Sequence, residues 1–107
     1  MKTRQPDIAL TPAIKWGNIG GGGTGVVTDP GSGDWYVTRT SVGVYVVTFT
    51  KPFANIPVVV CTSHYGGGGI IAATVQARSA TSFTVNVCNS AGSIDSNVEF
   101  VALGSVK

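Results

Sequence analysis

The sequence predicts a small all-β domain, an antiparallel β-sandwich. Short runs rich in Val, Thr, Tyr, Phe and Ile recur from Trp35 onward, clusters of Gly, Pro, Asn and Ser separate them, and no helical periodicity competes with this pattern. The chain has 107 residues. Two domains of half that length would each bury too little apolar surface, so we expect a single core.

Strands are expected at the short, regular intervals that are typical of a sandwich or barrel. The clearest are Trp35 to Thr40, Val44 to Thr50, Val58 to Ser63, Ile70 to Arg78, Phe83 to Asn89 and Val98 to Leu103, with weaker patterns at Ile14 to Asn18 and Val26 to Thr28. Turn residues predict loops at 29–34 and 89–93. Because prolines interrupt residues 1–13, we expect an extended arm or stalk remnant there, followed by one domain over 14–107.

Alternation along the strands predicts which side chains are buried. The inward positions are Tyr45, Val47, Phe49, Phe83, Val85, Val87, Val98, Phe100 and Ala102. Apolar residues also occupy outward positions, namely Val44, Val46, Val101 and Leu103. An isolated sandwich would carry polar residues there, so we expect one further layer to cover them: the N-terminal segment, or identical subunits around a threefold axis.

Charged residues make up 11% of the chain, against about 25% in an average soluble domain. Sister subunits that cover part of the surface would explain the deficit, and so would a secreted or viral surface built from Ser, Thr, Asn and Gly. The net charge of +2 is spread without a basic run, so we expect no nucleic-acid partner. No apolar stretch approaches the ~20 residues of a membrane span, and the start lacks a signal-peptide pattern, so we expect no membrane insertion and assembly in the cytoplasm.

The residue inventory predicts a protein without catalytic residues, metal or cofactor. The single histidine, His64, cannot easily meet Cys61, because positions i and i+3 of a strand point to opposite faces. Neither glycine run, 20–23 or 66–69, continues as a phosphate-binding loop. Cys61 and Cys88 lack zinc-site spacing, and free thiols are favoured over a disulfide.

Two groups of polar residues are candidates for binding a ligand. His64 and Tyr65 adjoin the second glycine run, where a sugar could stack and form hydrogen bonds; the alternative is that Tyr65 caps the sandwich and His64 is solvated. Asn89, Asp95 and Asn97 line the loop before the last strand and could bind sugar hydroxyls, or serve turn formation only. Arg78 and Glu99 are a candidate ion pair across strands or subunits.

The motif Gly43-x-Tyr45-x-Val47-x-Phe49-x-x-Pro52-Phe53, followed by 57–60, resembles β-sandwich domains at the C-terminal ends of bacteriophage tail fibres and related bacterial surface proteins, and more loosely H-type lectins. Residues 80–86 and Phe100-x-Ala102-x-Gly104 follow in the same order. The resemblance implies a jelly-roll or H-type-lectin-like fold, a homotrimer, a place in a virion tail or on an extracellular fibre, and binding of glycans or other receptors.

Two functions remain open at this stage. The first is a non-catalytic receptor- or glycan-binding head domain of a trimeric phage tail fibre or bacterial surface fibre. The second is a purely structural trimerisation, decoration or capsid-type module without a ligand. The residues alone do not choose between them.

Overall fold

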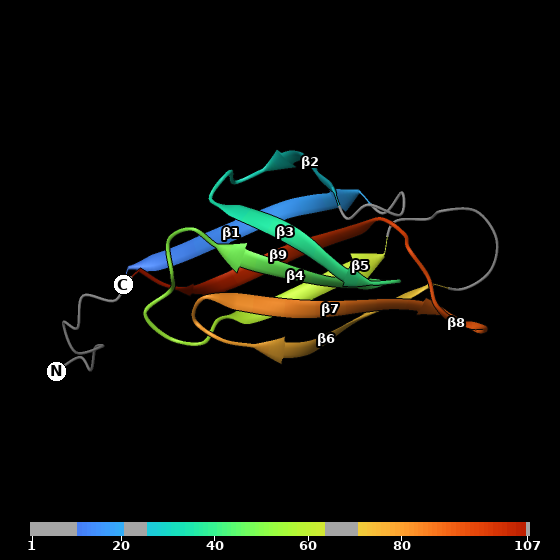
Figure 1. Cartoon of the computed structure of the whole chain (residues 1–107). Coiled ribbons are helices and arrows are strands. Elements are labelled where there is room, and N and C mark those ends of the chain that lie inside the picture. The colour runs from blue at the N-terminus through green and yellow to red at the C-terminus, as the bar shows by residue number, and fades with distance from the viewer. Residues whose placement is uncertain (1–10, 21–25, 64–70, 107) are drawn as a thin grey trace, which may run out of the picture.

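A computed structural model of the chain describes residues 11–20, 26–63 and 71–106, and these residues form two antiparallel sheets. One sheet has the order β2-β1-β9-β5 and the other the order β3-β4-β7-β6, with β8 paired to β7. The strands are β1 (Pro12–Gly20), β2 (Val26–Gly31), β3 (Trp35–Ser41), β4 (Val44–Phe49), β5 (Val58–Ser63), β6 (Ala72–Arg78), β7 (Ser82–Asn89), β8 (Gly92–Ser93) and β9 (Val98–Ser105). Figure 1 shows the two sheets as stacked layers. The all-β, antiparallel sandwich is confirmed.

The observed strands differ from the expected ones mainly at their ends. The strand β1 begins at Pro12, before the expected Ile14, because Pro12 pairs with Ser105 of an extended β9. Proline is tolerated at the first residue of a strand, where its missing N–H costs no ladder bond. The short strand β8 was missed, since its residues Gly92 and Ser93 lie in a segment whose composition predicts only a turn.

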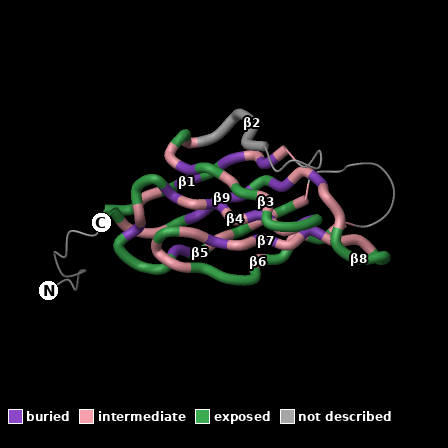
Figure 2. The backbone as a smooth tube through the Cα atoms, viewed as in Figure 1, coloured by how far each residue is buried: buried purple, intermediate pink, exposed green. Residues whose placement is uncertain are grey.

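The core follows the predicted alternation. All nine side chains that were expected to point inward are buried, and buried and less buried positions alternate along β4, β7 and β9 in Figure 2. Aromatic rings fill the space between the sheets: Phe100 lies edge-on to Trp35 at 4.9 Å and to Phe83 at 5.0 Å between ring centroids. Edge-to-face pairs of this kind stabilise a core beyond their buried area.

Trp35 is accommodated by a glycine on the facing sheet. A Cβ atom on Gly17 would lie 1.9 Å from Cζ2 of Trp35, so a side chain there is incompatible with the observed ring position. The indole nitrogen of Trp35 donates to the backbone oxygen of Trp16 at 3.0 Å. Trp35 therefore has a structural role in the core, and its contacts hold β1 and β3 together at this point.

One inward position carries a charge that the alternation does not predict. Lys15 is only 6% exposed, and its ammonium group donates to Asp34 and lies 5.2 Å from the centre of the Phe53 ring. Asp34 also accepts a hydrogen bond from Ser32. Burial alone would raise the pKa of Asp34, but the hydrogen bonds from Lys15 and Ser32 outweigh it and lower the pKa.

Both cysteines are free, as expected, and they lie on different sheets. Cys61 is on β5 and Cys88 on β7. Burial raises the pKa of the Cys61 thiol to about 12, which disfavours its reactive thiolate form. Among the residues that are described, no helix has the length and apolar character needed to cross a membrane.

Candidate functional site: the outer face of one sheet

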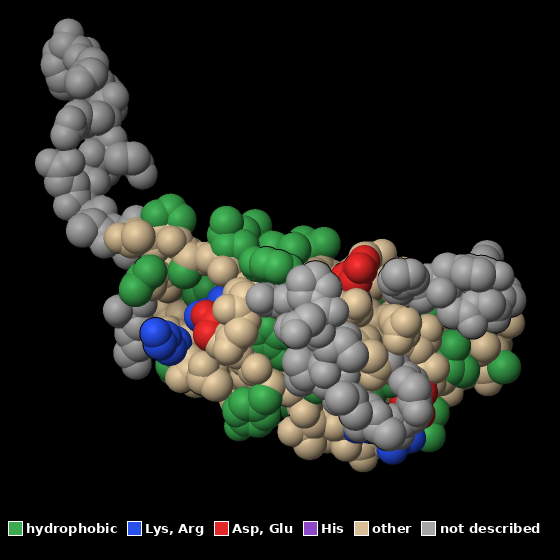
Figure 3. Space-filling model, turned by 90° about the horizontal axis from the view of Figure 1, so that it is seen from above, with side chains coloured by type: hydrophobic (Ala, Val, Ile, Leu, Met, Phe, Trp, Pro, Cys, Tyr) green, Lys and Arg blue, Asp and Glu red, His purple; other side chains and the backbone are tan. Residues whose placement is uncertain are grey.

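The outward side of the β2-β1-β9-β5 sheet carries six apolar side chains, which we call the apolar face. Strand pairing places them in two rows across β1, β9 and β5. The first row is Ile14, Leu103 and Val58, and the second is Trp16, Val101 and Val60. Every member is between 39% and 60% exposed. Figure 3 shows hydrophobic side chains gathered along one long side of the molecule.

The apolar face corrects one expectation. Val101 and Leu103 were predicted to share an outward surface with Val44 and Val46. Instead, β9 and β4 belong to different sheets, so the two pairs lie on opposite outer surfaces of the sandwich. Alternation predicts on which side of its strand a residue lies, but not which sheet the strand joins. For this reason the two pairs were wrongly assigned to one surface.

A polar row follows the two apolar rows on the same surface. It consists of Asn18, Glu99 and Thr62, again aligned across β1, β9 and β5. Two shallow hollows flank β9 where the polar row meets the second apolar row. One, of about 290 Å³, lies on the β1 side and includes Trp16 and Asn18. The other, of about 220 Å³, lies on the β5 side and includes Val60 and Thr62; Glu99 lines both.

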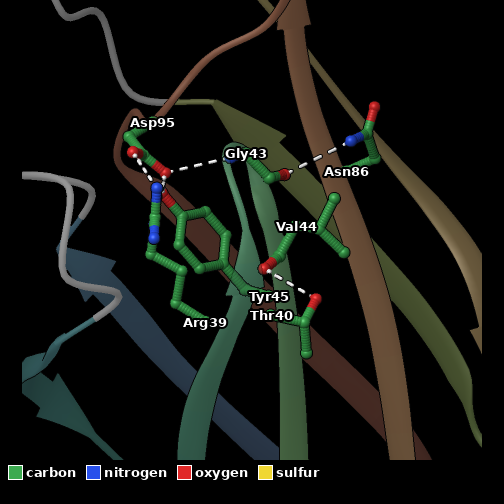
Figure 4. A network of polar contacts seen from close by, with 7 residues as sticks. All are labelled: Arg39, Thr40, Gly43, Val44, Tyr45, Asn86 and Asp95. Atoms are coloured by element: carbon green, nitrogen blue, oxygen red, sulfur yellow. Dashed lines mark hydrogen bonds and ion pairs between the residues drawn. The ribbon is translucent and has the colours of Figure 1, made fainter.

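Asp95 is the centre of a polar network that joins the segment before β9 to the turn between β3 and β4 (Figure 4). Its carboxylate accepts hydrogen bonds from Arg39, from the backbone N–H of Gly43 at 2.9 Å and from the Tyr45 hydroxyl at 2.8 Å. The hydrogen bond from Arg39 is the main cause that lowers the pKa of Asp95 to about 2, followed by the bond from Gly43.

The same network affects its other members. The hydrogen bond to Asp95 raises the pKa of Arg39. Burial first, and then Asp95, raise the pKa of Tyr45 to about 12. Gly43 has a φ of +72°, and a Cβ atom there would lie 2.5 Å from the backbone oxygen of Val87, so glycine is needed to form this turn. The network therefore fixes the loop geometry at one end of the sandwich.

The remaining predicted binding residues are placed as follows. The Asn89 side chain accepts a hydrogen bond from the backbone N–H of Ala91 at 2.9 Å, which is the local turn bond that asparagine commonly forms. Asn97 is half-buried just before β9. His64 and Tyr65 lie outside the described residues. A role in ligand binding stays a prediction for all five residues.

Arg78 and Glu99 are not neighbours across strands. Arg78 ends β6 in one sheet and donates to the backbone oxygen of Pro57 at 3.1 Å, whereas Glu99 is on β9 in the other sheet. Within the described ranges, no three His, Cys, Asp or Glu side chains lie close enough to bind a metal ion.

No family model, curated protein or solved structure matches this chain. What the chain does must therefore be argued from the surfaces described above.

Sequence reasoning identified Val101 and Leu103 but missed the four flanking members of the apolar face. The signal was present: Ile14 and Trp16 alternate with buried positions in β1, as Val58 and Val60 alternate with half-buried positions in β5. What the sequence lacked was the strand order, which places both strands beside β9.

Proposed function

We propose that this chain is a non-catalytic head domain of a homotrimeric fibre, of the kind found in phage tails or on bacterial surfaces, and that its copies associate through the apolar face. The observation that carries this proposal is the pair of uninterrupted apolar rows across three adjacent strands. The resemblance of residues 35–104 to fibre-tip domains supports the trimeric state and the fibre context.

Physical chemistry favours covering this surface. Single exposed apolar side chains are normal, but a contiguous group on one flat face marks an interaction site. Burial of apolar area stabilises a complex by about 25 cal/mol per Å², and all six side chains retain a large share of their area to bury. On the opposite sheet Val44 and Val46 also point outward, but strand pairing sets Val46 beside Thr38 and Thr84 and Val44 beside Asn86, so polar side chains interrupt these rows.

A receptor or glycan would be bound at the end of the sandwich that carries Asn89, Asp95 and Asn97, with His64 and Tyr65 as the further predicted contacts. The purely structural alternative is favoured by one observation: Asp95 and Asn89 use their side-chain oxygens for hydrogen bonds within the domain itself. In that alternative the loops position no ligand, and the chain serves assembly alone.

Light scattering tests the assembly. The wild-type chain should have the mass of a trimer, and Val101→Asp should have the mass of a monomer with an unchanged circular-dichroism spectrum. Thr38→Asp is the matched control, because it introduces the same charge on the outer surface of the other sheet and should leave the trimer intact. A monomeric wild-type chain over the micromolar range contradicts the proposal.

A glycan array on the trimer then separates the two functions. Binding that is lost in Asn97→Ala, with an unchanged unfolding temperature, supports a receptor-binding head. Absence of binding to any glycan favours the structural module.

A further inference from the structure

We propose that the apolar face pairs unlike flanks: Ile14 and Trp16 on β1 of one copy pack against Val58 and Val60 on β5 of the next copy. This inference rests on the proposed self-association and specifies how the copies meet. The occupant of the face is thus a second copy of this chain, with Val101 and Leu103 of β9 between the two flanks.

The difference in side-chain size between the flanks is the first argument. On the β1 side of β9 the rows end in Ile14 and Trp16, and on the β5 side they end in two valines. Pairing like flanks would press two tryptophans together at one contact and leave a gap between small valines at the other. Interfaces pack as densely as protein interiors, so the bulky flank fits best against the small one.

The hollow on the β5 side offers a place for the partner's indole ring. It is lined by Val60 and Val101 on its apolar side and by Thr62 and Glu99 on its polar side. A buried tryptophan needs an acceptor for its N–H, and the Thr62 hydroxyl and the Glu99 carboxylate are acceptors at that rim. Trp16 from the next copy therefore finds both apolar contact and a hydrogen-bond acceptor in the same hollow.

The polar row gives the relative direction of the copies. Glu99 is the charged residue among the members of the two apolar rows and the polar row. If copies ran in opposite directions, each Glu99 would face the apolar rows of its partner, and burying a carboxylate there is costly. If the copies run in the same direction, the polar row of one copy lies beside the polar row of the next. A rotation axis parallel to the strands relates the copies in this way.

Cysteine cross-linking tests the pairing. Ile14 and Val58 both pair with Leu103 from opposite sides, so their Cα atoms are two strand spacings apart, about 9.5 Å. A disulfide bridges Cα atoms only up to about 7 Å, so Ile14→Cys and Val58→Cys cannot form one within a single chain. The changes are made in a Cys61→Ser, Cys88→Ser background, because both native thiols are free. The double variant should then give covalent oligomers under mild oxidation, while each single variant and the background chain remain uncross-linked at the same protein concentration.

The other outcomes overturn the inference in distinguishable ways. Efficient cross-linking of the Ile14→Cys or Val58→Cys single variant would mean that like flanks meet. Absence of cross-links in all variants, with an oligomeric mass that Val101→Asp still reduces to a monomer, would mean that the apolar faces meet in another arrangement; this inference would then fail and the proposed function would stand. A monomeric mass for the wild-type chain would remove the proposed assembly and this inference together.

Discussion

Asp95 receives both ends of the Arg39 guanidinium group: Nε donates to Oδ1 at 3.1 Å, and Nη2 donates to Oδ2 at 3.0 Å. Such two-pronged pairs fix geometry as well as adding attraction. Arg39 on β3 and Asp95 in the segment before β9 are 56 positions apart in the chain. The pair therefore ties β3 to the segment that leads into β9, at the end of the sandwich where ligand-binding residues were predicted.

Asp95→Asn should reduce the dependence of stability on acid pH. The folded-state pKa of Asp95, about 2, lies below its ordinary value of 3.8, so its carboxylate stabilises the fold above pH 3.8 and this contribution is lost as the pH falls to about 2. Urea unfolding between pH 2 and pH 5 measures it. The stability difference between wild type and variant should shrink toward pH 2, and a difference that stays constant across this range would contradict the assignment.

Gly17→Ala should destabilise the domain by about 1 to 3 kcal/mol, because the added methyl group overlaps the Trp35 ring and forces it to move. Thermal or urea unfolding measures the loss. The matched double variant with Trp35→Phe should show less than the sum of the two single effects, since a smaller ring leaves room for the methyl group. Simple additivity would mean that the two residues do not interact.

Phe100→Ala should cost about 3 to 5 kcal/mol of unfolding free energy, a large share of the total for a domain of this size. The side chain is 2% exposed and contacts both Trp35 and Phe83, so its removal leaves a cavity between the sheets. Val106→Ala, at a 53% exposed position, is the control and should change stability little. Equal effects of the two changes would argue against the observed core.

Lys15→Met should lower stability by about 1.5 to 3 kcal/mol, because Asp34, which is partly shielded from water, loses its charged hydrogen-bond donor. Combining it with Asp34→Asn should recover part of this loss, since the double variant no longer holds an unpaired carboxylate. Urea unfolding of the four proteins in the cycle gives the coupling. A double variant weaker than Lys15→Met would contradict this account.

Cys61 should resist alkylation in the folded protein, because its thiol is nearly all protonated at pH 8. The Cys88→Ser variant isolates it: iodoacetamide should label Cys61 only after denaturant is added, as followed by mass spectrometry. Rapid labelling under native conditions would show that the thiol is more accessible than the structure indicates.

The sequence predicts the sandwich well because alternation is a local property. In β4, β7 and β9 each buried residue could be identified from its neighbours at two-residue spacing. Strand ends were less well predicted, as for β9, which continues past Leu103 because β1 supplies a partner as far as Ser105.

Features that depend on contacts distant in sequence were not predicted. The ion pairs of Arg39 with Asp95 and of Lys15 with Asp34 join residues far apart in the chain, and no local pattern links their members. Likewise, Trp16 and Val60 belong to one surface only because β9 lies between their strands. A single sequence predicts the side of the strand on which each residue lies, whereas the strand order determines which residues on adjacent strands are its neighbours.

The position of β9 affects the order in which the domain can fold during synthesis. It is made after the eight other strands that the structure describes, yet it lies between β1 and β5. During translation β1 and β5 are made before the strand that pairs with both. The two apolar rows are incomplete until β9 supplies Val101 and Leu103. If copies associate through the apolar face as proposed, that association can begin only after β9 has been made, so incomplete chains do not present the complete face.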